Sequence, residues 1–445
     1  MILSRTRTPL AISAAAAKRC LATVAAAGPS KQYKLVVIGG GSAGIAVAAK
    51  VARDPLFQGK KDILVIDPSA KHYYQPLWTF VGAGLKTLAE SEKPMADLIP
   101  QQADWLQQPV TKVDPANNIV LNANGTEIKY DYLVVAPGIR LDFDKIPGLN
   151  ETLGQNGVAS NYSVNSVEKT AEFLAAFKGG NAVFTQPATP IKCAGAPQKI
   201  AYLAEEIFRN NGIREKTNVT FHSGMGKIFA IDKYANELTK VAASRGVKVN
   251  LLSNLAEVRG DKREAVFKSL APEGGETVVK YDFLHVTPPM SAPPFIRESG
   301  IANADGWVDV DKETTQHNKF SNIFALGDAS ALPTSKTAAA AAAQSGVTAD
   351  NLLRAIKADS ATASSTYNGY TSCPLITGKG KLILAEFSGY TGQPMETFPF
   401  NQAHESAFSY YLTSDVIPSL YWQGQVKGLW NGPTAIRKFT NPFSS

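Results

Sequence analysis

The chain of 445 residues is long enough for two or three domains, and its 44% hydrophobic and 19% charged residues are typical of a globular protein. The net charge of +7 falls to about +3 without residues 1–30, which hold four basic and no acidic residues. No basic run has interleaved aromatic residues, so a nucleic-acid partner is not expected. The sequence contains no run of about 18 consecutive apolar residues, so no transmembrane helix is predicted.

The first thirty residues are rich in Ala, Ser and Thr, and the first acidic residue of the chain is Asp54. This composition is typical of a mitochondrial transit peptide, whereas a secretory signal would need a compact apolar run. The alternative is a tail that carries no address. Without this segment two cysteines are left, Cys193 and Cys373, and cysteines of an intracellular protein are usually inert core residues.

The first predicted element is a buried strand over Lys34–Ile38, followed by Gly39, Gly41 and Gly44 at GxGxxG spacing and then by a helix. The first glycine permits a tight turn, the second lets a pyrophosphate approach the backbone, and the third lets helix and strand pack closely. A second strand ends in Asp67, 23 residues after Gly44, where a carboxylate would accept a ribose hydroxyl. The pattern predicts a dinucleotide site.

An aromatic loop follows at residues 71–84, at the edge of the sheet where parallel sheets bind ligands. The alternative is that its aromatic residues only cover that edge, and for His72 alone this alternative is favoured. Residues 109–113 and 118–121 alternate around a turn and predict a β-hairpin, and a further strand is predicted over 132–136.

A second βαβ pattern begins with a predicted strand over residues 182–185 and a helix from about residue 198 to 210. Two more strands are predicted over 218–221 and 247–252. The first strand-to-helix loop of this unit has no GxGxxG, and Gly195 stands alone after Cys193. The nicotinamide-binding fingerprint is therefore missing from the second unit.

The chain then returns to the first unit. A strand within residues 320–330 ends in Gly327–Asp328, and an alanine-rich helix follows within residues 333–346. The last segment mixes aromatic and cationic residues at 408–439, and its breaks prevent one long helix: Pro418, Gly424, Gly428 and Pro433. Short amphipathic helices of this kind suit a membrane interface or an ordinary domain contact, and composition does not separate the two.

These elements together resemble the two-dinucleotide-binding-domain flavoproteins and, within them, the mitochondrial sulfide:quinone oxidoreductase family. The matching segments run from about residue 33 to the end: HYYQPLWTFVGAG (72–84), KCAGAPQK (192–199), HVTPPM (285–290), GWVDVDKET (306–314), PTSKTAAA (333–340) and YTSCPL (370–375). The resemblance implies an α/β fold of two Rossmann-like domains with a C-terminal membrane-interface segment. We expect a transit peptide over residues 1–30 and an FAD-binding domain in two pieces, 31–150 and 301–360. A second Rossmann-like domain without the fingerprint is expected over 151–300, and a redox-cysteine and membrane/quinone-binding region over 361–445.

The family resemblance also implies FAD as cofactor. Ser42 and Ala43 would lie under the pyrophosphate, Asp67 would hold the adenosine ribose, and the backbone of Val110 would lie beside the adenine. Asp328 would bind the ribityl chain, and the helix start at Lys336 would face the flavin ring. The full set of implied FAD contacts is Gly39, Gly41, Ser42, Ala43, Gly44, Asp67, Gln75, Val110, Asp328, Lys336, Thr337, Ala338 and Ala339.

The chemistry implied by the resemblance uses a disulfide between Cys193 and Cys373, which are 180 residues apart and so depend on the fold to meet within about 7 Å. Sulfide would attack this bond by thiol–disulfide exchange and leave a persulfide on Cys373, while the Cys193 thiolate donates electrons to the flavin. Lys192 and Lys199 flank Cys193, and positive charge favours its thiolate. Cys373, next to a proline, is expected in an exposed turn. Lys199 and Glu151 are candidate charged or proton-handling residues, and either is alternatively a surface residue.

The implied partners are hydrogen sulfide, ubiquinone, a sulfane-sulfur acceptor such as glutathione, sulfite or cyanide, and the inner mitochondrial membrane as a monotopic surface. No third cysteine matches the one that bacterial relatives use, so FAD should be non-covalent. Some relatives place a lysine near the quinone where this chain has Thr413. The five histidines lack metal-ligand spacing, so no metal is predicted: His72, His222, His285, His317 and His404.

Two other functions share part of this pattern. A type II NADH:quinone oxidoreductase has the FAD domain and membrane helices, but it needs a nicotinamide fingerprint and does not need the two cysteines. A sulfide or persulfide sensor would carry the flavin as a structural group and would not turn over repeatedly.

Overall fold

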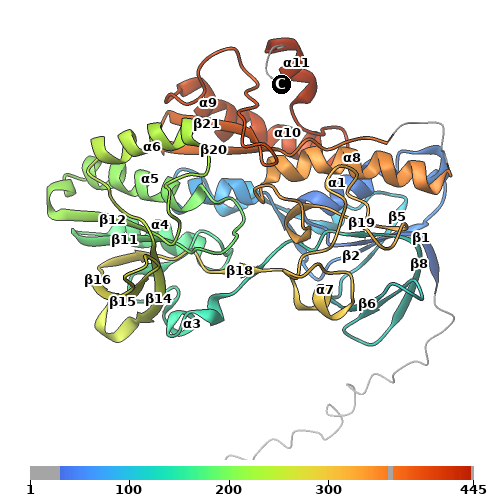
Figure 1. Cartoon of the computed structure of the whole chain (residues 1–445), viewed down its shortest axis with the longest axis horizontal. Coiled ribbons are helices and arrows are strands. Elements are labelled where there is room, and N and C mark those ends of the chain that lie inside the picture. Colours follow the sequence, from blue (N-terminus) through green and yellow to red (C-terminus); the bar gives the residue numbers. More distant parts are fainter. Residues whose placement is uncertain (1–30, 359–363, 442–445) are drawn as a thin grey trace, which may run out of the picture.

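The computed structural model describes residues 31–358 and 364–441, so the predicted transit peptide lies outside the described residues. Two α/β units lie side by side, and the C-terminal region runs across both of them (Figure 1). The predicted α/β fold with two Rossmann-like units is confirmed by the two sheets described below.

The first unit is built on a seven-stranded sheet in the order β5-β2-β1-β8-β7-β6. The seventh strand, β19, pairs with the C-terminal half of β8. β1, β2, β5, β8 and β19 run parallel, while β6 and β7 form the predicted antiparallel hairpin, which is confirmed. The strands of the sheet are Gln32–Ile38 (β1), Ile63–Ile66 (β2), Ala103–Leu106 (β5), Val110–Asp114 (β6), Ile119–Asn122 (β7), Glu127–Val135 (β8) and Ile323–Ala325 (β19).

Two helices pack together beside this sheet, α1 (Ser42–Val51) and α8 (Ala338–Ile356). The central strands are apolar on both faces, as parallel strands covered on two sides require. The small residues of α1 and α8 let the two helices approach each other closely above the strand ends. The alanine run is therefore a packed helix, as its helix propensity predicts.

The second unit contains a five-stranded parallel sheet in the order β10-β17-β11-β12-β13 and a three-stranded antiparallel sheet in the order β14-β15-β16. Its strands are Val158–Ala159 (β10), Gly180–Gln186 (β11), Thr217–Ser223 (β12), Lys248–Asn250 (β13), Ser253–Arg259 (β14), Glu264–Ser269 (β15), Glu276–Lys280 (β16) and Phe283–His285 (β17). Its helices are α4 (Val167–Ala176), α5 (Ala196–Asn210) and α6 (Asp232–Ser244). The strand predicted over 247–252 is shorter because Leu252 adopts a left-handed conformation, with φ of 54°.

Smaller elements complete these units. They are β3 (Lys71–Tyr73) paired with β4 (Glu92–Pro94), β9 (Arg140–Leu141) paired with β18 (Met290–Ser291), and the short helices α2 (Trp78–Gly82), α3 (Leu149–Thr152) and α7 (Pro294–Glu298).

The C-terminal region begins with a long antiparallel hairpin, β20 (Tyr370–Gly378) and β21 (Lys381–Ser388), which packs on both α5 and α8. Its helices α9 (Ala407–Tyr411), α10 (Ile417–Gln423) and α11 (Thr434–Thr440) lie along the top of the molecule in Figure 1. The predicted break at Pro418 is wrong. A π-helical segment over Leu412–Val416 links α9 to α10, and Pro418 lies in the first turn of α10, directly after the segment in which the α-helical hydrogen-bond pattern is already interrupted.

The helices of the described part of the chain include none that is both long and apolar enough to span a membrane.

Candidate active site

The glycine loop between β1 and α1 leaves an open cradle at the N-terminus of α1. Gly39 has φ of +98°, and a Cβ there would overlap the Ala136 carbonyl, while a Cβ at Gly44 would overlap the Gly39 carbonyl. At Gly41, by contrast, a Cβ would meet no atom within 4 Å. No side chain caps the helix start, so its N–H groups and the positive end of its dipole face this open space. The cradle therefore fits the pyrophosphate of a dinucleotide.

Asp67 lies beside this loop at the end of β2. Its Oδ2 accepts a hydrogen bond from the Gly40 N–H at 2.7 Å, and its Oδ1 accepts one from the Ser69 N–H at 2.8 Å. The carboxylate thus holds the glycine loop and the chain after β2 in place at the same edge of the sheet. Val110, the predicted adenine neighbour, is half-buried at the start of β6.

The predicted flavin end of the site lies where β19 ends and α8 begins. The Lys336 Nζ donates to the carbonyls of Asp328 and Ser330 at 2.7 and 3.1 Å, and it lies 3.8 Å from the centre of the Trp307 ring. Burial lowers the pKa of Lys336 to about 8 against the opposing attraction of Asp328. Burial also raises the pKa of Asp328, although Lys336 and Lys192 oppose this shift. Thr337 caps α8 by accepting from the Ala340 N–H at 3.0 Å.

The structure brings the two cysteines together. Cys193 ends the loop after β11 and Cys373 lies in the middle of β20, and the two thiols are hydrogen-bonded to each other. Between them, a Cβ at Gly195 would overlap the Cys373 Sγ, so glycine is required for this approach. The structure has both cysteines as free thiols, as in the reduced form of the pair that the resemblance implies. The prediction of an exposed turn for Cys373 is wrong, because this residue is a buried strand residue paired with Ala385.

One short loop before α8 is hydrogen-bonded to both cysteine segments. The Cys193 N–H donates to the Lys336 carbonyl at 2.7 Å, and Cys193 adopts a left-handed φ of 47°. Thr371, two residues before Cys373, shares a hydrogen bond of 2.9 Å with the Thr337 hydroxyl. The segment that faces the predicted flavin ring therefore also fixes the cysteine pair beside it.

The electrostatics of the pair are asymmetric. The hydrogen bond from Cys373 lowers the pKa of Cys193 well below that of a free thiol, and Lys199, whose Nζ lies 3.4 Å from the Cys193 Sγ, adds to this effect against the cost of burial. The same hydrogen bond and burial raise the pKa of Cys373. Burial lowers the pKa of Lys199, but the two sulfurs outweigh it, and the net shift is upward. Cys193 is thus the thiolate and Cys373 the thiol of the reduced pair.

The other predicted site residues divide into two groups. Gln75 is held to the segment that precedes Cys193, because its Oε1 accepts a hydrogen bond from the Lys192 Nζ at 2.7 Å. Burial lowers the pKa of Lys192 to about 8. Glu151, by contrast, is exposed on α3, which packs against β14 at the far side of the second unit (Figure 1). The structure does not bring Glu151 to the cysteine pair.

Three side chains at the site were missed by the sequence reasoning. The Tyr162 hydroxyl donates to the Cys193 carbonyl at 3.2 Å, and His72 and Tyr421 bond to each other beside the glycine loop. His72 stood in the aromatic loop that was predicted at the ligand-binding edge, so its position carried a signal. Nothing in the sequence pairs Tyr421 with it, because the two are 349 residues apart.

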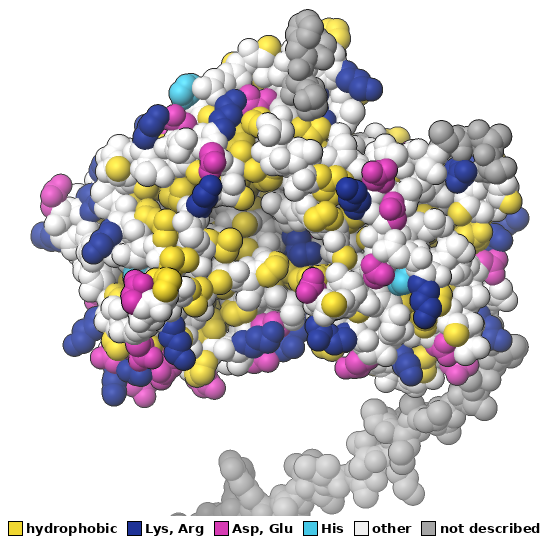
Figure 2. All heavy atoms as spheres, in the orientation of Figure 1, with side chains coloured by type: hydrophobic (Ala, Val, Ile, Leu, Met, Phe, Trp, Pro, Cys, Tyr) yellow, Lys and Arg dark blue, Asp and Glu magenta, His cyan; other side chains and the backbone are white. Residues whose placement is uncertain are grey.

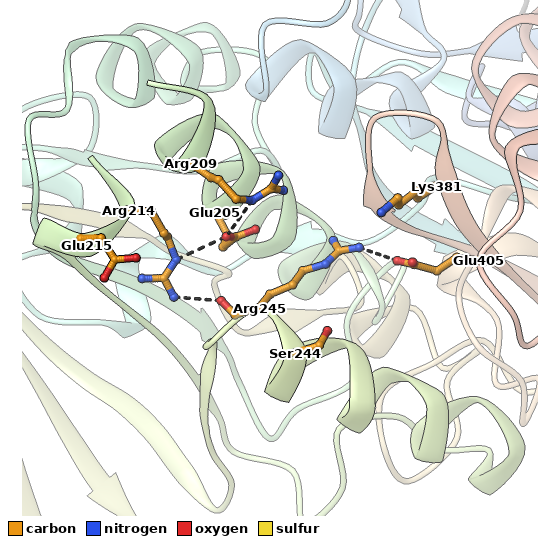
Figure 3. Close-up of a pocket in the computed structure, with 8 residues that line it drawn as sticks. All are labelled: Glu205, Arg209, Arg214, Glu215, Ser244, Arg245, Lys381 and Glu405. Atoms are coloured by element: carbon orange, nitrogen blue, oxygen red, sulfur yellow. Dashed lines mark hydrogen bonds and ion pairs between the residues drawn. The ribbon is translucent and has the colours of Figure 1, made fainter. Parts of the chain in front are cut away.

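A charged pocket lies away from these groups. It has a volume of about 550 Å³ and is lined at the junction of α5, α6 and β21 by residues that belong to no predicted site: Glu205, Arg209, Arg214, Glu215, Ser244, Arg245, Lys381 and Glu405 (Figure 3). Glu205 pairs with Arg209 and Arg214, and Arg245 pairs with Glu405 at 2.5 Å. The Arg245–Glu405 pair ties the C-terminal region to the second unit, whereas the pairs of Glu205 lie within the second unit. A separate hollow between the two units is surrounded mainly by hydrophobic side chains (Figure 2).

Comparison with known proteins agrees with this geometry. Residues 33–346 match the family model of the pyridine nucleotide-disulphide oxidoreductases. The chain is 48% identical over 406 residues to the mitochondrial sulfide:quinone oxidoreductase of Mus musculus, covering 91% of this chain and 89% of the relative. It is 41% identical over 433 residues to the corresponding protein of Schizosaccharomyces pombe, covering 92% and 93%.

A solved structure shares the fold. The sulfide:quinone oxidoreductase of Aquifex aeolicus superimposes with a TM-score of 0.76 at 20% identity, over 90% of this chain and 92% of that one. The sequence relatives settle the family. The chain belongs to the pyridine nucleotide-disulphide oxidoreductases and, within them, to the mitochondrial sulfide:quinone oxidoreductase family.

Proposed function

We propose that the chain oxidises hydrogen sulfide at the Cys193–Cys373 pair and delivers two electrons through FAD to ubiquinone at the inner mitochondrial membrane. The observation that carries this proposal is the contact of the two thiols, with Lys199 3.4 Å from the Cys193 sulfur and the α8 loop bonded to both cysteine segments. The family supports the same reaction, since its members are named for it.

The chemistry at the pair begins from the oxidised state. A sulfide anion attacks the Cys373 sulfur, the S–S bond breaks, and Cys193 leaves as a thiolate while Cys373 carries the persulfide. Cys193 is the better leaving group because Lys199, whose Nζ lies 3.4 Å from the Cys193 sulfur, stabilises its thiolate, and a stabilised thiolate leaves faster. An acceptor thiolate, sulfite or cyanide then takes the outer sulfur, the S–S bond of the persulfide breaks, and Cys373 is left reduced beside the Cys193 thiolate. Closing the S–S bond between the two cysteines gives up two electrons, which a bound flavin would accept, and restores the starting disulfide.

The residues around the cradle would hold the dinucleotide by its pyrophosphate at α1, with Asp67 on the adenosine side and the Lys336 loop on the flavin side. When bound, a flavin supplies two-electron transfer to a quinone, which no side chain of the pair can provide. This chain supplies the positions: the loop over 335–337 sets the cysteine pair, and Lys199 stabilises the Cys193 thiolate.

The decisive experiment adds sulfide or NADH anaerobically to the purified protein and follows bleaching of the visible absorbance of the flavin. Sulfide should bleach the flavin and NADH should not, because the loop after β11 has no nicotinamide fingerprint. Bleaching by NADH alone would instead assign the chain to the NADH:quinone oxidoreductases. Repeated turnover with decylubiquinone excludes a sensor, which would stop after one reduction.

The flavin is proposed to be non-covalent. Residues 31–445 contain Cys193 and Cys373 and no other cysteine, and both belong to the redox pair. Acid precipitation should therefore release all of the flavin into the supernatant. Flavin that stays with the precipitated protein would show a covalent link.

The sulfur acceptor is proposed to be a small nucleophile such as glutathione, sulfite or cyanide. Sulfide-dependent decylubiquinone reduction with each acceptor in turn ranks them by rate. If one acceptor fails to raise the rate above that of sulfide alone, it is removed from the set.

The C-terminal region is proposed as the membrane-binding face, bound from one side. Seven large hydrophobic residues of this region are exposed, with Leu429 at 61% and Phe439 at 88% the most so: Phe400, Phe408, Tyr411, Val416, Leu429, Ile436 and Phe439. Exposed aromatic and aliphatic groups beside Lys and Arg suit the membrane interface. Thr413 is largely buried in the π-helical segment among them, and its relation to the quinone is a prediction.

Liposome flotation tests this face in the intact protein. L429D and F439D should lose most of their flotation with liposomes, because a buried carboxylate opposes insertion. The matched control is L270D in the second unit, where the leucine is exposed to 47%, and it should float like the wild type. Loss of flotation in the control alone would place the membrane face elsewhere.

A further inference from the structure

The C-terminal region reaches the glycine loop through one buried side chain. The Tyr421 side chain of α10 is 2% exposed, and its hydroxyl lies 2.7 Å from the Ser42 Oγ and 2.5 Å from the His72 Nε2. The His72 Nδ1 in turn lies 2.8 Å from the Gly40 carbonyl oxygen. Four groups from three parts of the chain thus form one continuous hydrogen-bonded series.

The direction of this series follows from its end. The Gly40 carbonyl only accepts, so the His72 Nδ1 must carry the proton and donate. Burial lowers the pKa of His72, which keeps the ring neutral and leaves its Nε2 as an acceptor. The Tyr421 hydroxyl therefore donates to His72, and the Ser42 hydroxyl donates to Tyr421.

The series fixes one peptide plane of the phosphate loop. In a trans peptide the C=O and the following N–H point in opposite directions, so a Gly40 carbonyl turned to His72 turns the Gly41 N–H away from it, to the open side of the loop. The other side of Gly40 is fixed as well, because its own N–H donates to Asp67 at 2.7 Å. The donors that would face a pyrophosphate are thus set before it arrives.

The surrounding packing holds Tyr421 in this position. Its ring lies 4.3 Å from the ring of Tyr74, and the next residue, Trp422, lies 5.7 Å from His72. Further along, Gly428 touches the α1 backbone at Lys50 so closely that a Cβ would overlap it, and the Arg53 Nε donates to the Lys427 carbonyl at 3.0 Å. The segment after α10 therefore packs along the helix whose N-terminus forms the cradle.

We propose that Tyr421, acting through His72 and Ser42, is a positioning residue for the phosphate loop, so that the C-terminal region forms part of the dinucleotide site. The inference rests on the proposed flavin function of that loop. It assigns to α10 a second role beside membrane contact: retention of the cofactor.

The test is FAD rebinding to the full chain after removal of the flavin, followed by quenching of flavin fluorescence. Y421F removes one hydroxyl and should weaken FAD binding by about five- to tenfold. Y281F in the second unit is the matched control, because the Tyr281 side chain is equally buried and its hydroxyl has no hydrogen-bond partner among the described residues. It should bind FAD like the wild type. FAD binding is measured at a temperature at which all three FAD-free proteins are folded, because Y421F leaves the buried His72 Nε2 without its partner and should also lower the melting temperature.

His72 provides a second, independent variant pair. H72N keeps an amide donor near the position of Nδ1, whereas H72Q keeps a polar group near Nε2 but loses the donor to Gly40. H72Q should therefore weaken FAD binding more than H72N does. This pair also decides the matter if Y421F does not fold.

Two outcomes overturn the inference: wild-type FAD affinity in folded Y421F, or an equal loss of FAD affinity in Y281F. Neither affects the proposed reaction, which fails only if the wild-type protein does not couple sulfide oxidation to quinone reduction.

Discussion

The two Rossmann-like units use the same turn for different purposes. In both, a buried parallel strand ends and a helix begins beside the same central site, β1 to α1 in the first unit and β11 to α5 in the second. The first turn is short, rich in glycine and open, with space around Gly41. The second turn is longer and carries Cys193. The cysteine pair and Lys199 fill the space near the start of α5. The fold supplies the position, and the turn residues decide whether it binds a phosphate or holds a thiolate.

The largest expected effect tests the second turn. C193S or C373S should lower sulfide-dependent decylubiquinone reduction by about a thousandfold or more, since a hydroxyl replaces neither the nucleophile nor the disulfide. The measurement is steady-state quinone reduction, with FAD content as the control. Both variants should keep the flavin, because the first turn is untouched. Near-normal turnover in either variant would refute the disulfide mechanism.

The next effect tests Gly39, on the side of the first turn that packs against the protein. G39A should destabilise the fold by about 3 kcal/mol and abolish FAD binding, because the residue has φ of +98° and its Cβ would overlap the Ala136 carbonyl. Urea denaturation of the FAD-free protein measures the stability, and flavin fluorescence measures the binding. A variant as stable as the wild type would contradict the packing described here.

The open side of the same turn should respond differently. In G41A the added Cβ meets no protein atom within 4 Å and fills the space proposed for the pyrophosphate. The free energy of unfolding should change by less than about 1 kcal/mol, while the FAD dissociation constant should rise by about tenfold. Comparing G39A with G41A separates a structural glycine from a ligand-facing one, and equal effects on stability would remove that distinction.

The smallest effect tests the charge at the second turn. K199M removes the cation 3.4 Å from the Cys193 sulfur, so the pKa of Cys193 should rise. A thiolate exists above the pKa of its thiol, and so the pH profile for alkylation of the reduced protein by iodoacetamide should move to higher pH. At pH 7 the rate should fall by about tenfold. K240M changes an exposed lysine of α6 and should leave the profile unchanged; an identical profile in K199M would exclude Lys199 from thiolate stabilisation.

The parts of this arrangement that depend on neighbouring residues could be predicted from the sequence. The glycine turn, the hairpin over β6 and β7, and helix α5 follow from spacing and propensity within a few residues, and they appear where they were predicted. Helix α8 begins within its predicted segment but extends ten residues beyond residue 346, to Ile356. Errors arose where a neighbour in space changes the local preference. Cys373 lies next to a proline, which suggested a turn, yet pairing with β21 makes it a strand residue. Pro418 was expected to break a helix and instead lies in the first turn of one.

The amino-acid sequence alone therefore determined the kind of site. It predicted a dinucleotide-binding turn in the first unit, no nicotinamide fingerprint in the second unit, and two cysteines in a chain that resembles the sulfide:quinone oxidoreductases. Only the tertiary structure decided the partners: Lys199 with the Cys193 sulfur, the α8 loop with both cysteine segments, and Tyr421 with His72. The reason is physical. Local patterns record the conformational preferences of neighbouring residues, whereas contacts between residues 180 or 349 positions apart depend on how the separate elements pack.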